Sequence, residues 1–406
     1  MNTGDIHLVL GISCSGKSTF IEHQCNSGEW GDIPVMMAYE LRPDLSNLPS
    51  SDCIVHYNLF RPFDNDAANL ENHFTDDVIL AGLLNLGQRI RATLLVVHPD
   101  ALAKRVLLQE KVEGSLRKTD SAYPSQKVFE LLCRIDSLDF YLQWINMLEG
   151  YGIQVNLINA ETDAYQGIDS IEKLSAYLDE EKSISYTESE INHIIARNDF
   201  EYQRLQLGSN LFTEGDDRSP SLSILDQDLS GKSLLDVGCA YGYFCFEAEQ
   251  RNAAKVVGTE LKRHRYIGAN IAKQITGARS KILYKNIFET PLTETYDVVL
   301  LLNVLHHLKE PVRALRMLAM ICAEKLIIEF PTLSDSKFNS TLPTTLETDQ
   351  SLPLIGVSLQ GEIDQTFLFT PAAIERILMN HDSLFSSIEF MDSPMNPERC
   401  VAICRK

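Results

Sequence analysis

Each half of this chain contains a glycine-bearing turn that directly follows a short apolar run. In the first half, Ile6–Leu10 leads into Gly11-Ile-Ser-Cys-Ser-Gly16-Lys17-Ser18-Thr19. In the second half, Ser233–Val237 leads into Gly238-Cys-Ala-Tyr-Gly242. A strand that enters a helix through such a turn opens a twisted parallel sheet with helices on both faces. The chain is therefore expected to fold as two α/β units.

Further apolar runs alternate with helical patterns along both halves, which predicts two doubly wound, mainly parallel sheets. In the first half these runs are Val35–Ala38, Cys53–Tyr57, Leu94–Val97 and Gln154–Ile158, with a long helical pattern over Ser125–Leu148. In the second half they are Lys255–Gly258, Lys281–Tyr284, Asp297–Leu302 and Lys325–Glu329. We expect domains at 1–165 and 201–406, joined by an acidic, helical linker at 166–200. The irregular stretch 331–366 is expected to be a lid, a binding loop or simply mobile.

Length and composition agree with two domains, because 406 residues with 44% hydrophobic content can bury two separate cores. No apolar stretch approaches the roughly 20 residues that span a bilayer, and the N-terminus does not resemble a secretion signal. The nine cysteines form no CxxC pair, so reduced thiols are expected. These features predict a cytoplasmic protein without a membrane partner.

The chain has a net charge of −20, and its charged residues are distributed unevenly along the sequence. The first 190 residues hold 14 Lys and Arg against 29 Asp and Glu, so this half would repel a phosphate backbone, and DNA is not an expected partner. The compact basic cluster Lys262-Arg263-His264-Arg265 has two interpretations. It meets an anionic substrate, or it is the solvated start of a helix.

The first glycine turn satisfies the phosphate-binding pattern Gly-x4-Gly-Lys-Ser without a mismatch. Gly11 and Gly16 permit a tight path that turns backbone N–H groups toward phosphate oxygens. Lys17 would reach the terminal phosphates, Ser18 would ligate Mg²⁺, and Thr19 continues the loop into a helix whose positive end favours the same anion. This turn predicts a site for ATP with Mg²⁺.

Downstream, the order of elements resembles the small nucleotide- and shikimate-kinase-like branch of P-loop proteins. That resemblance implies a basic lid after the fourth strand, with Arg105 as the preferred contact to the transferred phosphoryl group. The other lid cations would be Lys104, Lys111, Arg117 and Lys118. The alternative is a surface helix with ordinary solvated charges.

The sequence does not single out one residue as the second ligand of the metal. Glu40, Asp52 and Asp64 are the carboxylate candidates, and no apolar run ends in an aspartate that would face the loop. His56 and Arg61 are candidates for contact with the phosphoryl acceptor, or for a role in the structure of the loop.

The second glycine turn is preceded by Asp236 and followed 18 residues later by Glu260, which ends another apolar run. Gly238 and Gly242 would let backbone approach the methionyl part of S-adenosylmethionine, and Glu260 would accept hydrogen bonds from the ribose hydroxyls. Related spacing also serves dinucleotides. The run that begins at Asp297 and ends in Asn303-Val-Leu-His306-His307 is typical of class I methyltransferases.

Several stretches of this half resemble the family of the tRNA wobble-uridine 5-oxyacetic-acid methyltransferases and their relatives. They are Leu205–Gly215, Asp236–Ala248, Val257–Glu260, Asn303–Pro311 and Phe369–Arg376. The resemblance covers residues 200–406 and implies that Asp236, Gly238, Gly242 and Glu260 bind the cofactor. It further places Asn286 and Ile287 near the adenine and Asn303 near the methionine end. Plain S-adenosylmethionine is expected rather than a carboxylated form, because no cations were found to grip an extra carboxylate.

His306 and His307 occupy a position from which a substrate hydroxyl can be deprotonated, and a histidine pKa near 6.5 suits that role. The alternative is that one ring packs on the sheet and the other faces solvent. Methyl transfer to a good nucleophile needs only alignment, so a base is not obligatory.

Together these patterns predict a bifunctional transferase, with an ATP-dependent kinase-like domain and an S-adenosylmethionine-dependent methyltransferase domain. A small molecule or glycan is the expected acceptor, since it agrees with the acidic surface. One alternative is a tRNA- or RNA-modifying methyltransferase with an accessory nucleotide-hydrolysing domain. A third is that the first domain senses nucleotide without catalysis.

Overall fold

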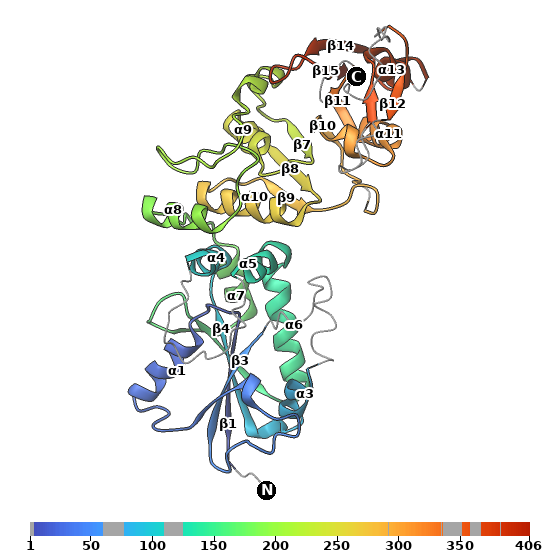
Figure 1. Cartoon of the computed structure of the whole chain (residues 1–406). Coiled ribbons are helices and arrows are strands. Elements are labelled where there is room, and N and C mark those ends of the chain that lie inside the picture. The colour runs from blue at the N-terminus through green and yellow to red at the C-terminus, as the bar shows by residue number, and fades with distance from the viewer. Residues whose placement is uncertain are drawn as a thin grey trace. The chain divides into compact units, whose positions relative to one another are not determined.

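The computed structural model describes residues 4–59, 77–108, 125–290, 292–333, 335, 351–357, 367–381 and 383–406. The chain divides into two compact units, Met1–Ser185 and Tyr186–Lys406 (Figure 1). The division falls inside the linker that the sequence predicted at 166–200. No helix in the described ranges has the length and apolar character needed to cross a membrane.

The sheet of the first unit has the strand order β2-β3-β1-β4-β5-β6. Its strands are β1 (Ile6–Gly11), β2 (Val35–Met37), β3 (Cys53–Asn58), β4 (Ile90–Val96), β5 (Gln154–Asn159) and β6 (Gln166–Ile168). Strand β1 pairs in parallel with both β3 and β4, and β6 alone is antiparallel to its neighbour. The sequence of β1 is almost wholly apolar and buried, as a central strand covered on both faces requires.

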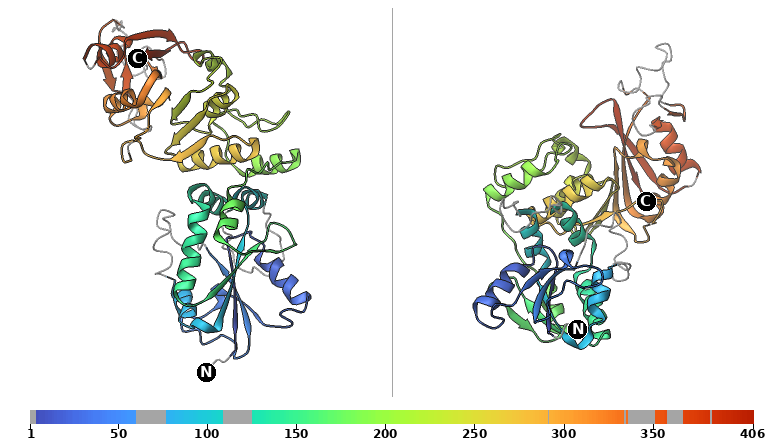
Figure 2. Two further views of the ribbon diagram at one scale, coloured as in Figure 1. Left: turned by 180° about the vertical axis from the view of Figure 1, so that it is seen from behind. Right: turned by 60° about the horizontal axis from the view of Figure 1, so that its bottom comes forward.

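Helices cover both faces of this sheet, with α1 on one side and α3 and α6 on the other (Figures 1 and 2). The helices are α1 (Lys17–Asn26), α3 (Val78–Leu84), α4 (Pro99–Leu108), α5 (Ser125–Arg134), α6 (Ser137–Gly150) and α7 (Ile171–Leu178), with short 3-10 turns η1 (Ala38–Glu40) and η3 (Gly87–Arg89). The prediction of one helical pattern over 125–148 is wrong in detail. Asp136 interrupts it, because its side chain accepts from the backbone N–H of Asp139 and starts α6 as a new helix.

The sheet of the second unit has the strand order β14-β15-β11-β10-β7-β8-β9. Its strands are β7 (Ser233–Val237), β8 (Lys255–Glu260), β9 (Lys281–Tyr284), β10 (Tyr296–Leu302), β11 (Cys322–Pro331), β14 (Ser387–Asp392) and β15 (Arg399–Arg405). The strands from β7 to β11 are parallel, whereas β15 is antiparallel to β11 and β14 is antiparallel to β15. A separate antiparallel pair is formed by β12 (Ile355–Val357) and β13 (Phe367–Phe369).

The helical segments of this unit are α8 (Glu188–Arg197), η4 (Ser219–Ile224), α9 (Tyr243–Gln250), α10 (Arg263–Thr276), η5 (Leu305–His307), α11 (Pro311–Ile321), α13 (Pro371–Glu375) and η6 (Arg376–His381). The core lies between the sheet and these helices, with Leu235, Val299 and Leu326 fully buried at its centre. The predicted runs at β1, β3, β7 and β10 are buried, whereas those at β2, β5 and β9 keep many exposed or half-exposed residues.

Strand order places both glycine turns at comparable positions. The chain leaves β1 toward β2 and β3 on one side and returns to β4 on the other, and β7 likewise separates β8 and β9 from β10 and β11. In open α/β sheets, ligands bind beyond the carboxyl ends of the strands where the strand order reverses. Each unit therefore presents its glycine turn at the expected place for a ligand.

Candidate functional site

The turn after β1 needs glycine at two positions for two reasons. Gly16 adopts a φ of 87° at the start of α1, in the left-handed region that side chains other than glycine rarely enter. Gly11 has an ordinary backbone conformation, but a Cβ built there would lie 2.3 Å from the Ser15 hydroxyl oxygen. Backbone conformation therefore requires glycine at position 16, and close packing against Ser15 requires it at position 11.

Polar groups converge inside this loop. Lys17 is only 4% exposed, and its Nζ donates to the carbonyl oxygens of Gly11 at 2.8 Å and Ile12 at 2.9 Å. The Ser15 hydroxyl is buried and has no hydrogen-bond partner among the described residues. The Ser18 hydroxyl oxygen lies 3.5 Å from His56 Nε2 on β3. A buried ammonium and an unsatisfied hydroxyl under a helix N-terminus fit an anionic ligand such as a nucleotide phosphate.

The candidates for a second metal ligand do not gather beside Ser18. Glu40 accepts from the backbone N–H of Met37, in the turn that starts η1. Asp52 accepts from the backbone N–H of Asp5 and precedes β3, whereas the glycine turn after β1 lies at the other end of that strand, beside Asn58. Arg61 and Asp64 lie outside the described residues. Within the described ranges, no group of three or more His, Cys, Asp or Glu side chains is arranged to hold a metal ion.

Arg105 lies beside the glycine turn after β1. Its Nη1 is 3.9 Å from the position that a Cβ on Gly16 would take. Its guanidinium donates to the carbonyl oxygens of Ala160, at 3.2 and 3.3 Å, and of Glu161, at 2.6 Å. The side chain thus bridges α4 and the loop after β5. The remaining lid cations Lys111, Arg117 and Lys118 lie outside the described residues, and Lys104 donates to the Ser185 carbonyl at 2.7 Å.

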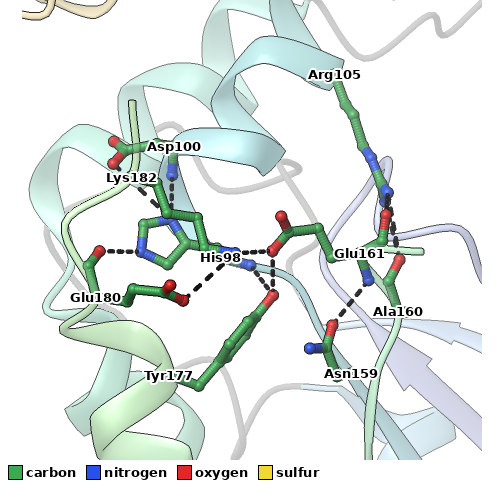
Figure 3. A network of polar contacts seen from close by, with 9 residues as sticks. All are labelled: His98, Asp100, Arg105, Asn159, Ala160, Glu161, Tyr177, Glu180 and Lys182. Carbon is green, nitrogen blue, oxygen red and sulfur yellow. Dashed lines mark hydrogen bonds and ion pairs between the residues drawn. The ribbon is translucent and has the colours of Figure 1, made fainter. Parts of the chain in front are cut away.

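A polar network continues from Arg105 through the residue that it contacts (Figure 3). Glu161 Oε2 accepts from the Tyr177 hydroxyl at 2.6 Å and from Lys182 Nζ at 2.5 Å. The Tyr177 hydroxyl in turn accepts from the backbone N–H of His98 at 2.8 Å. Partial burial acts to raise the pKa of Glu161, but the hydrogen bonds from Lys182 and Tyr177 hold that pKa below its ordinary value. The network fixes an ionised glutamate next to the arginine that borders the glycine turn after β1.

In the second unit a cavity opens at the carboxyl edge of the sheet. Its lining comes from the glycine turn, from the ends of β10 and β11, and from the chain before β7. The lining residues are Tyr202, Gln203, Arg218, Ser221, Asp236, Gly238, Cys239, Phe244, Leu302, Asn303 and Glu329. The cavity therefore brings together three residues that the sequence predicted for the cofactor, namely Asp236, Gly238 and Asn303.

The glycine turn has no room for side chains. Gly238 has a φ of 75°, and a Cβ there would lie 2.5 Å from Val304 Cγ2. Gly242 has a φ of 86°, and its Cβ would lie 3.0 Å from the Phe246 ring. Both positions therefore require glycine, while contact of their backbone with a ligand stays a prediction.

Two buried carboxylates flank this turn. Asp236 lies near the end of β7 and is only 2% exposed. Burial and the neighbouring Glu260 raise its pKa to about 7. Glu260 is also buried, and its oxygens accept from the backbone N–H groups of Ala240 at 2.9 Å, Leu261 at 2.8 Å and Lys262 at 2.7 Å. Glu260 thus ties the glycine turn to the start of α10, while its role toward a ribose stays a prediction.

The other predicted residues lie as follows. Asn303 has a φ of 57°, and its side-chain oxygen accepts from Arg399, whose Nε donates to Asp335 at 3.2 Å. Asn286 accepts from the backbone N–H of Phe288 at 3.1 Å, and Ile287 is buried beside it. Neither is among the residues that line the cavity.

The two histidines lie together in η5, with ring centroids 4.0 Å apart. His306 is buried and His307 is exposed, as the structural alternative for this pair proposed. The cavity lining includes neither of them. A catalytic role for either histidine stays a prediction.

Sequence reasoning missed several residues of the cavity. Glu329 is 2% exposed, and its Oε1 accepts from the Ser393 hydroxyl at 2.5 Å. It ends a predicted strand, so its position at the carboxyl edge was a usable signal. Gln203 and Arg218 come from an irregular segment that isolated bridges hold together, and no periodic pattern marks that segment.

Comparison with known proteins agrees with this description of the second unit. Residues 215–381 match the model of a protein family described as a methyltransferase domain. The chain is 28% identical over 179 residues to a tRNA U34 carboxymethyltransferase of Desulfotalea psychrophila, with 42% of this chain and 51% of that protein covered. It is 27% identical over 154 residues to a ubiquinone biosynthesis O-methyltransferase of Aliivibrio fischeri, with 37% and 63% covered.

The second unit therefore contains a class I S-adenosylmethionine-dependent methyltransferase domain. The chain spans about half the length of the first of these relatives. Among solved structures, the N-terminal domain of EvdMO1, crystallised in the presence of SAH and D-fucose, is 18% identical with a TM-score of 0.41 and covers 54% of this chain and 97% of that one. None of these matches assigns an activity to the first unit.

Proposed function

We propose that this chain is a two-site transferase that methylates a small-molecule or saccharide acceptor in its second unit and transfers a phosphoryl group from ATP in its first. The observation that carries the proposal is the matching position of the two glycine turns. Each lies at the reversal of strand order in its own sheet, and each has a backbone too tightly placed for a Cβ. Two separate ligand sites are the simplest reason to maintain both.

For methyl transfer, the residues of the cavity would position the cofactor and provide a proton acceptor. S-adenosylmethionine, when bound, supplies a methyl group on a positively charged sulfur. Gly238 leaves room for the cofactor, and Asp236 and Asn303 lie at its expected methionine end. Because the cofactor carries positive charge, it would favour the ionised form of Asp236 over the protonated form that burial stabilises.

We give the role of proton acceptor to Glu329 rather than to His306 or His307, because Glu329 lines the cavity. With S-adenosylmethionine bound as the methyl donor, the Glu329 carboxylate would take up the proton of the acceptor hydroxyl as that hydroxyl oxygen is methylated. Ser393 holds one oxygen of this carboxylate in place. Such a transfer contributes roughly 10²–10⁴-fold to rate in well-aligned sites.

For phosphoryl transfer, the loop after β1 would provide positive charge and a backbone path that fits phosphate groups. Lys17, Ser15 and the N-terminus of α1 would hold the phosphates, and Ser18 would contact Mg²⁺. Arg105 lies close enough to the loop to neutralise charge on a transferred phosphoryl group. Together these residues fit ATP better than they fit a neutral ligand.

The two sites can be tested by calorimetric titration of ATP and S-adenosylmethionine into the full chain. Lys17→Ala should abolish ATP binding and leave S-adenosylmethionine binding unchanged, and Glu260→Ala should do the reverse. Lys173→Ala is the matched control for the first, because Lys173 forms an exposed ion pair with Asp169. If Lys17→Ala bound ATP as the wild type does, the first half of the proposal would be wrong. If Lys17→Ala instead changed methylation while no phosphorylated product appeared with the wild type, the first unit would be a nucleotide sensor.

A second candidate acceptor is tRNA, because the Desulfotalea psychrophila relative is named for a tRNA position. Binding of total tRNA at low salt, with an affinity that falls steeply as salt increases, would favour this candidate. Indifference to tRNA at low salt would remove it.

A further inference from the structure

The second unit has another cavity, a groove that lies apart from both proposed transfer sites. The groove runs between α9, the end of α10 and the irregular segment 204–219, and its volume is about 640 Å³. Among the described residues, it shares no lining residue with the cavity that contains Asp236 and Glu329. Small-molecule sites typically measure about 300–1,000 Å³. The groove is therefore large enough to hold a ligand of its own.

One face of α9 forms the floor of the groove. It is lined there by Tyr243, Phe246, Glu247 and Gln250, whose spacing along the chain places them on one side of the helix. Tyr243 and Phe246 are each 9% exposed, and the segment 204–219 contributes Phe212, which is 43% exposed. Aromatic rings from two parts of the chain thus border the groove. The faces of such rings attract cations.

The charged side chains of the groove are mostly acidic. Among its described lining residues, Asp217, Glu247 and Glu249 stand against a single basic residue, Arg204. Glu249 already accepts from the backbone N–H of Arg279 at 2.8 Å, whereas Asp217 is exposed and Glu247 is half-buried. The balance of these charges favours a positively charged ligand.

Glu247 lacks a full counter-charge. Burial raises the pKa of its carboxyl, and the positive charge of Arg251 offsets this only in part. Arg251 is engaged elsewhere, since its Nη1 donates to the backbone carbonyl oxygens of Leu222, Leu225 and Asp226 at 3.2, 3.2 and 3.0 Å. A cation in the groove would therefore stabilise the ionised form of Glu247.

The Tyr243 hydroxyl lies in the field of two of these carboxylates. Burial, Glu247 and Asp217 together raise the pKa of Tyr243 to about 12, so the phenol stays neutral at neutral pH. Both carboxylates thus act on the part of the groove where α9 begins. From Tyr243 to Gln250 the floor extends for about 10 Å, at roughly 1.5 Å per helical residue. A ligand that fits is elongated, with ammonium groups for the carboxylates and an apolar chain for the rings.

We propose that this groove binds a linear aliphatic polyamine, whose ammonium groups pair with Glu247 and Asp217 and whose methylene chain lies against Tyr243 and Phe246. A compact inorganic cation has no apolar part to bury against the rings, and a neutral ligand leaves the carboxylates without a counter-charge. The site is separate from the two proposed transfer reactions and does not depend on either of them.

Amide hydrogen exchange of the full chain tests this inference, with spermidine as the probe. Ammonium chloride at equal ionic strength is the control for charge alone, and the trilysine peptide is the control for a basic peptide segment. All are compared at about 0.15 M salt, where long-range attraction to an acidic surface is screened. Spermidine should slow exchange in 204–219 and 243–250 and leave α13 unchanged, and ammonium should change neither. The affinity is read from the spermidine concentration that gives half of this slowing.

Two variants that change charge in opposite directions sharpen the test. Glu247→Gln removes a carboxylate at constant shape and should lower the affinity for spermidine about tenfold, as loss of a charge-assisted hydrogen bond does. Arg204 stacks on Phe212, with its guanidinium carbon 4.6 Å from the ring centroid. Arg204→Gln removes this positive charge and should raise the affinity about twofold to fivefold. Glu375→Gln is the matched control, because Glu375 is exposed and lies outside the groove.

Equal slowing by ammonium, no slowing by spermidine, or an equal loss of affinity in Glu247→Gln and Glu375→Gln would each overturn the inference. So would an Arg204→Gln variant that binds spermidine more weakly than the wild type. Binding of trilysine without binding of spermidine would make the groove a peptide site and would likewise remove the polyamine. Unchanged exchange in β7 of every variant shows that the fold is intact.

Discussion

Replacing Asp236 by asparagine tests whether the buried carboxyl at the end of β7 holds a proton in the folded protein. Burial and the neighbouring Glu260 raise the pKa of Asp236 from 3.8 to about 7. The folded protein then binds this proton more tightly than the unfolded chain does. Its contribution to stability is therefore complete below pH 3.8 and is lost as the pH rises through about 7.

The size of the effect follows from the same pKa values. A change of one pKa unit corresponds to about 1.36 kcal/mol, so the difference between 3.8 and 7 corresponds to about 4 kcal/mol. Asparagine has the shape of aspartate but does not ionise. The free energy of unfolding of Asp236→Asn, minus that of the wild type, should therefore increase by about 4 kcal/mol between pH 4 and pH 8.

The assay is urea unfolding across that pH range, followed by circular dichroism and by tryptophan fluorescence. The chain has two tryptophans, Trp30 and Trp144, and both belong to the first unit, so a transition seen only by circular dichroism reports on the second. Asp297→Asn is the control of opposite sign. Hydrogen bonds from the Ser233 backbone and side chain hold the pKa of Asp297 below its ordinary value, so its contribution to stability is lost as the pH falls. A difference for Asp236→Asn that does not change with pH would refute the reasoning.

Three further results are expected. Gly238→Ala should destabilise the second unit by roughly 1–3 kcal/mol and weaken S-adenosylmethionine binding. The reason is that the new Cβ would lie 2.5 Å from Val304 Cγ2, on a residue whose φ is 75°. A variant with the thermal stability and affinity of the wild type would contradict this account of the turn. Glu161→Gln should remove a contribution to stability that the wild type retains above pH 4.5 and loses as the pH falls, since hydrogen bonds lower the pKa of this carboxyl. Acid unfolding of both proteins, followed by tryptophan fluorescence, should therefore show stabilities that converge at low pH. A stability difference that stays constant with pH would argue against an ionised Glu161. Burial raises the pKa of the Cys400 thiol to about 12, so iodoacetamide should leave Cys400 unmodified in the folded protein at neutral pH and label it in urea; equal labelling rates would show that β15 is open.

The interior of both units was accessible to sequence reasoning because buried parallel strands are continuous apolar runs. The runs at β1, β3, β7 and β10 needed no knowledge of their partners. The helix break at Asp136 was missed, because one capping aspartate does not interrupt a helical pattern of apolar residues. The edge strand β14 was missed because it has little burial and therefore no apolar run, and β15 was missed although its centre is a buried apolar run.

The same distinction holds for the sites. A glycine turn is a local motif, so a few neighbouring residues in the sequence are enough to predict its backbone conformation. Arg218 and Gln203 reach the cavity from an irregular segment, and only the folded chain brings them to β7 and β10. Glu329 lay at the end of a predicted strand, but its importance depends on which strands are neighbours, which periodicity does not encode.

If the first unit binds nucleotides as proposed, the position of the Lys17 ammonium has a consequence for which nucleotides it would accept. At rest this group is already satisfied by the carbonyls of Gly11 and Ile12, so a ligand gains little unless it offers acceptors that outcompete both. A monophosphate that stops short of the lysine leaves those contacts in place. A chain of phosphates that extends past the loop would displace them, so under the proposed function the loop itself would select nucleotides by their number of phosphates.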